Sequence, residues 1–140
     1  MATIPFSSTR APGAAVRALA SDAVLVTGEV PDVRGWLAAA DVVVAPLMLA
    51  RGVQNKVLEA MAMARPVIAS PAAAEGIDHA GTIRVAQGAA AVIEALSDRA
   101  GAARLGQAAR ARVLARYDWD ACLAPLDGMM RLERTHRVAA

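Results

Sequence analysis

One stretch of the chain carries most of the information about its fold: Arg51-Gly-Val-Gln-Asn-Lys-Val-Leu-Glu-Ala-Met-Ala-Met-Ala-Arg-Pro-Val-Ile-Ala-Ser70. It predicts a glycine-containing loop, a helix over about residues 54–64 and a buried strand over 67–69. Pro66 breaks the helix, and the three residues after it are apolar. A loop that leads into a helix presents free backbone N–H groups and the positive end of the helix dipole, which together favour an anion. The stretch is therefore the first place to look for function.

Strand-like and helical patterns alternate on both sides of this stretch. Apolar runs predict strands at 3–7, 24–27, 42–45, 67–69 and 82–86, and helical patterns fill 14–20, 31–39, 54–64 and 88–96. Asp32 is the expected N-cap of the second helix, and Asp98 that of a longer helix ending near Tyr117, before a final amphipathic helix over 119–134. Strands alternating with helices indicate βαβ units. We therefore predict an α/β fold: a Rossmann-like, doubly wound parallel sheet flanked by helices. It forms one domain over 1–140, with a frayed start at 1–9 and a frayed tail at 135–140.

Composition narrows the classes of function. The formal net charge is only +2, and no run of Lys and Arg is interleaved with aromatic residues, so we expect no nucleic-acid surface. Cys122 is the only cysteine, and no carboxylate pair has metal-ligand spacing, so we expect no disulfide and no metal site. No apolar run reaches the roughly 18 residues of a membrane span, and the first ten residues lack the order of a signal peptide. The expected location is cytoplasmic, with a peripheral place at the inner membrane as the second option.

The candidate site follows from the predicted topology. Ligands of doubly wound sheets bind beyond the carboxyl ends of the strands, and Asn55, Lys56 and Glu59 share one helix face at one of these ends. A diphosphate there would meet backbone N–H groups and the Lys56 charge, while Glu59 would accept hydrogen bonds from the vicinal hydroxyls of a ribose. The alternative is an ordinary surface pair between Lys56 and Glu59, worth roughly 0.2–0.5 kcal/mol. The residues alone leave both interpretations open.

Residues 52–70 resemble the signature of the nucleotide-sugar-binding domain of group 1 (family 4) glycosyltransferases, which have the GT-B fold. Other matching pieces follow in the same order: Val26-Thr-Gly-Glu-Val-Pro-Asp-Val33, Trp36-Leu-Ala-Ala-Ala-Asp-Val-Val-Val-Ala-Pro46, Ala74-Glu-Gly-Ile77 and Tyr117-Asp-Trp119. The resemblance covers about residues 10–127. The form Asn55-Lys-Val-Leu-Glu59 is most similar to sugar transferases linked to exopolysaccharide and exosortase loci.

The resemblance implies a role for each candidate residue. Glu59 would hold the ribose hydroxyls, and Lys56 and Arg51 are the candidate catalytic residues because they would stabilise the leaving diphosphate. Arg51 departs from the pattern, since many relatives have a glutamate there. The remaining candidates would also bind the donor. Gly52, Val53, Gln54 and Asn55 would lie beside the diphosphate and sugar, and Gly28 to Val30 would line the base pocket. Arg10 would contact a phosphate, although Thr9 replaces the usual Gly before it, and Glu75 would lie in a loop near the pocket.

The implied function is donor binding in a retaining glycosyltransferase of the hexosyltransferase type, with a nucleotide-diphosphate sugar as substrate and no further cofactor. GT-B enzymes react between two domains, so without the N-terminal acceptor domain we expect binding with little or no transfer. The alternative is a non-catalytic binding or assembly module that docks with a partner or self-associates. An exposed apolar face on the final helix, at Leu123, Leu126, Met129 and Met130, would favour the module. We expect those side chains to pack on the domain, and Trp119 to anchor the core.

Overall fold

The computed structural model describes residues 2–4, 12–120, 122, 123, 125 and 126, and it has the predicted α/β architecture. Its strands are β1 Ala2–Ile4, β2 Val24–Val26, β3 Val43–Ala45, β4 Val67–Ala69 and β5 Arg84–Val85. Its helices are α1 Ala14–Arg17, α2 Arg34–Ala39, α3 Asn55–Ala62, α4 Pro71–Ala74, α5 Ala89–Ser97 and α6 Arg99–Tyr117. Strands and helices alternate along the described chain up to α5, as βαβ units require.

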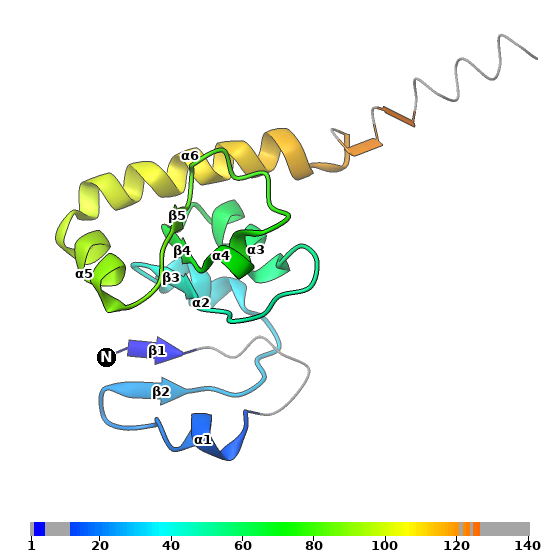
Figure 1. Cartoon of the computed structure of the whole chain (residues 1–140). Helices are drawn as coiled ribbons and strands as arrows, with labels where there is room; N and C mark the ends of the chain where they lie inside the picture. Colours follow the sequence, from blue (N-terminus) through cyan, green and yellow to red (C-terminus); the bar gives the residue numbers. More distant parts are fainter. Residues whose placement is uncertain (1, 5–11, 121, 124, 127–140) are drawn as a thin grey trace, which may run out of the picture.

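Every described strand pairing is parallel, which confirms the predicted sheet type, but the strands form two sheets. β1 pairs with β2, and β4 lies between β3 and β5. Figure 1 shows β1, β2 and α1 as one group below the β3–β4–β5 sheet, with α5 and α6 at the far side of that sheet. The second sheet carries the stretch that the sequence singled out.

The core lies where α3 covers the β3–β4–β5 sheet. All three residues of β4 are buried, as a continuous apolar run in a central parallel strand predicts. From α3, Val57, Ala60 and Met61 pack onto it with no exposed surface. These three positions recur at helical spacing and leave the Lys56 and Glu59 face to solvent.

Helix α6 fixes the far end of α3. A Cβ atom at Gly106 would overlap the backbone of Ala64, at the turn after α3, and would lie 3.1 Å from the Arg65 carbonyl carbon. Only glycine allows this approach. The guanidinium of Arg110 donates to the Ala62 carbonyl oxygen one turn further along α6, so the two helices are held by a close backbone contact and a hydrogen bond.

Several boundaries differ from those predicted. Helix α2 begins at Arg34 with Val33 as its N-cap, because the Asp32 carboxylate accepts the backbone N–H of Arg34 at 2.9 Å and also pairs with its guanidinium. Residues 71–74, which the turn-like sequence left without an element, form α4. Of the final helix expected over 119–134, residues 119, 120, 122, 123, 125 and 126 are helical, and the rest of that range lies outside the described residues.

Candidate functional site

The loop from Pro46 to Gln54 leads from the carboxyl end of β3 into α3, as predicted. Gly52 has a φ of +66°, the left-handed region that favours glycine. The Gln54 side-chain amide donates to the Gly52 carbonyl at 3.1 Å, so it folds back onto the loop. As N-cap of α3, Gln54 gives the helix no side-chain hydrogen bond. The first N–H groups of α3 are thus left to solvent or to a ligand.

The charged candidates project from this segment. Arg51, Asn55, Lys56 and Glu59 are all exposed. The ion pairs of the described structure involve other residues, and Lys56 and Glu59 do not pair with each other. The surface-pair interpretation therefore has no counterpart in this structure. An ammonium and a carboxylate stand one turn apart on the exposed start of a helix, each with its hydrogen-bonding capacity available.

Ser70 ties the loop to the sheet and to α4, a role that we did not predict. It is 1% exposed. Its hydroxyl donates to the Leu47 carbonyl at 2.6 Å and accepts the Ala73 N–H at 3.2 Å as the N-cap of α4. The signal was present in the sequence, since Ser followed by Pro at the end of a strand is a helix start. One buried hydroxyl thus holds the start of the 46–54 loop, at Leu47, against the end of β4 and the start of α4.

The Glu75-Gly76 turn comes against the same loop. Gly76 has a φ of +79°, and a Cβ atom built on it would lie 3.9 Å from Cγ2 of Val53. Glu75 is exposed. Of the candidates from separate segments, Val53 and the Glu75-Gly76 turn are therefore brought together beyond the carboxyl ends of β3 and β4.

Asp78 anchors this turn to α6. Its backbone N–H donates to the Tyr117 hydroxyl at 2.7 Å, and its carboxylate pairs with the guanidinium groups of Arg112 and Arg116. Arg112 Nε also donates to the Asp78 carbonyl at 3.1 Å. The hydrogen bond from Arg112, with a smaller contribution from Arg116, lowers the pKa of Asp78 below its ordinary value. This cluster depends on residues more than thirty positions apart, so local sequence patterns did not indicate it.

The predicted base pocket lies after β2. Gly28 has a φ of +71°, and a Cβ there would meet Pro12 at 3.9 Å; Gly28 and Val30 are half-buried. The structure shows no contact that ties them to α3 or to its loop. Arg10, the expected phosphate contact, lies outside the described residues.

An apolar pocket of about 400 Å³ opens beyond the carboxyl ends of β3, β4 and β5, which is the edge where ligands of such sheets bind. None of the predicted site residues lines it, and Gln87 gives it a polar side chain. Its lining residues are Val44, Pro46, Leu47, Met48, Ile68, Ser70, Ala86, Gln87, Gly88, Ala89 and Val92.

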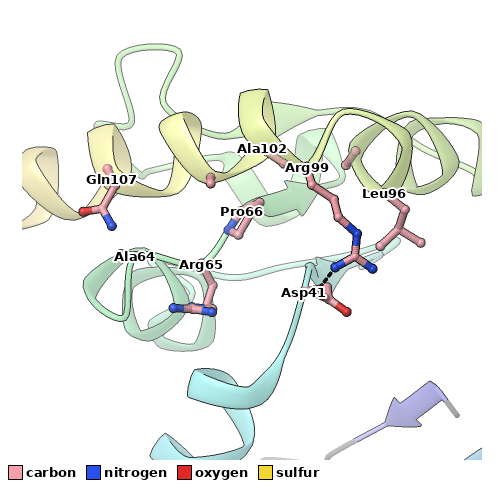
Figure 2. A pocket seen from close by; sticks show the side chains of 10 residues that line it. Asp41, Ala64, Arg65, Pro66, Leu96, Arg99, Ala102 and Gln107 are labelled. Atoms are coloured by element: carbon pink, nitrogen blue, oxygen red, sulfur yellow. Dashed lines mark hydrogen bonds and ion pairs between the residues drawn. The ribbon is translucent and has the colours of Figure 1, made fainter.

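A smaller pocket of about 170 Å³ lies at the opposite edge, before β3 and β4 and under the start of α6. Figure 2 shows Arg99 reaching from α6 to Asp41, with Pro66 close by. Arg99 Nη1 lies 2.9 Å from Asp41 Oδ1. Because this pocket is at the amino ends of the strands, it lies away from the predicted donor site.

The expectations for the final helix were wrong in two respects. Trp119 is 77% exposed and does not anchor the core. Leu123 and Leu126 are also exposed, so they do not pack on the described part of the domain; Met129 and Met130 lie outside the described residues. Three apolar side chains at spacings of four and three form an exposed face, a pattern typical of contact surfaces.

The described residues include neither a candidate membrane-spanning helix nor a candidate metal site. Within the described ranges no helix is long and apolar enough to cross a membrane. Among the same residues no group of three or more His, Cys, Asp or Glu side chains could hold a metal ion.

Comparison with known proteins agrees with the topology. A family model described as glycosyl transferases group 1 matches residues 8–100, well over half of the chain. The matched range contains β2, the whole β3–β4–β5 sheet, the 46–54 loop, α3 and the Glu75-Gly76 turn. No curated protein and no solved structure matches the chain. The chain belongs to the group 1 glycosyl transferase family.

Proposed function

We propose that the chain binds the nucleotide-diphosphate sugar donor of a retaining, hexosyltransferase-type glycosyltransferase. The observation that carries the proposal is the exposed start of α3, where uncapped backbone N–H groups, Lys56 and Glu59 lie together at the carboxyl edge of the sheet. Neither charge is used in an ion pair within the described structure. Family membership makes a sugar nucleotide the ligand that such a place would take.

In this proposal each group has a distinct partner on the donor. The diphosphate lies over the amides of Gly52 to Asn55 at the positive end of the helix dipole. Lys56, with Arg51, stabilises the charge that develops on the leaving diphosphate. Glu59 accepts hydrogen bonds from the two ribose hydroxyls, and Gly28 to Val30 face the base. Glu75 and Arg10 lie at the edge of the donor site.

The 140 residues are expected to bind the donor with little or no transfer. In GT-B enzymes the acceptor binds to a second domain, and positioning both substrates supplies much of the rate acceleration. The proposed setting is cytoplasmic or peripheral at the inner membrane, in exopolysaccharide synthesis, with no metal or other cofactor.

Calorimetric titration of UDP and GDP tests the proposal. Glu59→Gln keeps the size of the side chain but removes its charge, and Lys56→Ala removes the ammonium. Each should weaken binding about tenfold or more, because hydrogen bonds to charged groups contribute about 1.5–3 kcal/mol. The matched controls, Asp22→Asn and Arg104→Ala, change exposed charges elsewhere and should leave affinity unchanged. Equal binding by all variants, or none by the folded chain, would contradict the proposal.

The second candidate is an assembly module, and the exposed Trp119, Leu123 and Leu126 favour it. If this face mediates self-association, light scattering after size-exclusion chromatography will show a mass above 14.4 kDa that rises with concentration. Trp119→Ser with Leu123→Ser should restore the monomer. A strict monomer at all concentrations would count against self-association.

A further inference from the structure

Asp78 is held by α6 through three different groups. Its backbone N–H donates to the Tyr117 hydroxyl at 2.7 Å, and its carbonyl oxygen accepts from Arg112 Nε at 3.1 Å. Its carboxylate accepts from Arg112 again and from Arg116 Nε at 2.8 Å. Arg112 and Arg116 are four residues apart and so share one face of the helix. A residue that one helix bonds through donor, acceptor and side chain keeps a fixed place relative to that helix.

This anchor is better shielded from solvent than a second Asp–Arg pair on α6. The side chains of Arg112 and Asp78 are 30% and 39% exposed, whereas those of Arg99 and Asp41 are 70% and 62% exposed. Exposed pairs contribute little, while charge-assisted hydrogen bonds that act together contribute more. Because the hydrogen bond from Arg112 lowers the pKa of Asp78, the carboxylate is charged and the anchor is complete at neutral pH.

The turn before Asp78 carries this support to the loop that leads into α3. Ile77 is 6% exposed and belongs to the core, so the chain between Asp78 and Gly76 is fixed as well. Gly76 lies against Val53, since a Cβ atom built on it would be 3.9 Å from Val53 Cγ2. Val53 is followed by Gln54, the N-cap of α3. The contact therefore supports the loop immediately before the first N–H groups of the helix.

The 46–54 loop has few other ties at this end. Its start is held at Leu47 by the Ser70 hydroxyl, but Met48 and Leu49 are 85% and 90% exposed. The Gln54 side chain bonds only carbonyl groups of the loop itself, so it does not join the loop to another segment. The contact with the Glu75-Gly76 turn does.

We propose that Asp78 is a positioning residue for the donor site. By bonding α6, it holds the turn against Val53 and keeps the loop amides before α3 in place for a diphosphate. A loop that is already held in its bound conformation loses less entropy when the ligand binds, so the affinity is higher. The role rests on the proposed donor site at the start of α3, although Asp78 itself does not touch the donor.

Affinity for UDP and GDP, measured by calorimetry, tests this role with Asp78→Ala and a matched control, Asp41→Ala. Both variants lose an aspartate that pairs with an arginine of α6, but Asp41 lies at the opposite edge of the sheet. Losing a negative charge by itself favours an anion, so a weakening runs against the change in charge. Asp78→Ala should weaken binding by about fivefold to thirtyfold, the factor that ordering one loop residue implies, and Asp41→Ala should not weaken it.

Val53→Ala shows whether the effect passes through the contact with the turn. This variant removes the methyl group that faces Gly76 and should weaken binding as Asp78→Ala does. In the double variant the two losses should not add, so Asp78→Ala should change the affinity of Val53→Ala by less than about twofold. The loss in Tm from Asp78→Ala should be the same in both backgrounds, because the bonds to α6 do not involve Val53.

Tyr117→Phe is a milder variant that keeps both charges. It removes only the acceptor of the Asp78 N–H and should weaken binding by about twofold or more, as one neutral hydrogen bond implies. In the 15N-labelled chain without ligand, Tyr117→Phe and Asp78→Ala should both shift the amide resonances of Gly52 and Val53, whereas Asp41→Ala should not.

Three results would overturn the positioning role. Unchanged affinity in Asp78→Ala and Tyr117→Phe, with binding still weakened in Glu59→Gln, would leave the donor site in place and remove the role of Asp78. Additive losses in the double variant, or an equal loss in Asp41→Ala, would show that the effect does not pass through the turn. No binding by the folded wild-type chain would contradict the donor site itself, and the role of Asp78 with it.

Discussion

Replacing Gly106 with alanine tests how α6 is docked on the turn after α3. The added Cβ atom would overlap the Ala64 carbonyl oxygen and would lie 3.1 Å from the Arg65 carbonyl carbon. These are backbone atoms next to the buried strand β4, so they cannot move aside as a flexible side chain would. Helix α6 would have to shift outward, which would also strain the hydrogen bond from Arg110 to the Ala62 carbonyl.

Two opposing effects set the magnitude. Alanine is favoured over glycine inside a helix by about 0.8–1 kcal/mol, whereas overpacking costs about 1–3 kcal/mol. Gly35 in α2 is the control, because a Cβ there meets no atom within 4 Å, so Gly35→Ala should gain up to about 1 kcal/mol. Gly106→Ala should therefore be less stable than Gly35→Ala by about 1–3 kcal/mol, or about 4–12 °C in Tm for a domain of this size.

Thermal and urea unfolding of the two variants and the wild type measure this difference. Unchanged m-values would show that the comparison reflects stability. If Gly106→Ala raised the stability as much as Gly35→Ala does, the close approach of α6 to the Ala64 turn would be refuted.

Three further predictions concern the core, the loop and the α6 cluster. Met61→Ala should lower the free energy of unfolding by about 2–5 kcal/mol, because the side chain has no exposed surface and leaves a cavity; a loss below about 1 kcal/mol in urea unfolding would contradict its place in the core. Ser70→Ala should cost about 1–3 kcal/mol, since α4 loses its cap and the Leu47 carbonyl its donor, and it should accelerate hydrogen exchange in the 46–54 loop; unchanged exchange there would disprove the tie. Asp78→Asn should destabilise the chain at neutral pH. Because Arg112 lowers the pKa of the folded carboxyl, its stabilisation is present above the unfolded value of about 3.9 and is lost as pH falls through the folded pKa. The difference in Tm from wild type should therefore shrink below about pH 4, and a difference independent of pH would rule out a contribution from the carboxylate charge.

The elements that local patterns determine were predictable. Strand β4 was expected over 67–69 and is found at Val67–Ala69. The prediction succeeded because a short apolar run between two prolines is typical of a buried central strand in a parallel sheet. The Asp98 cap was also confirmed, since its carboxylate accepts the Gly101 N–H at 2.8 Å. Helix α2 was predicted to start at residues 31 and 32 but begins at Arg34. Asp32 bonds both the first backbone N–H of the helix and the Arg34 guanidinium, and the local pattern does not decide at which residue the helical turn begins.

Features that depend on distant segments were not predictable in the same way. The division into two sheets depends on how β1 meets β3, and no local pattern encodes that. The sequence did indicate the loop and the exposed face of α3, because both follow from Gly52 and the helical spacing of Asn55, Lys56 and Glu59. The Asp78 cluster and the apolar pocket are made of residues far apart in the chain, while the exposure of Trp119 reversed an expectation based on residue type alone.

Amide chemical shifts of the 15N-labelled chain, followed during titration with UDP and GDP, test the central claim most directly. The account predicts saturable shifts in the amides of Gly52 to Lys56, with smaller ones at Gly28 to Val30, and in Glu59→Gln the same shifts should need a nucleotide concentration about tenfold higher or more. Shifts confined to Ala86 to Ala89 at the apolar pocket, or no shifts in the folded chain, would contradict a donor site at the start of α3.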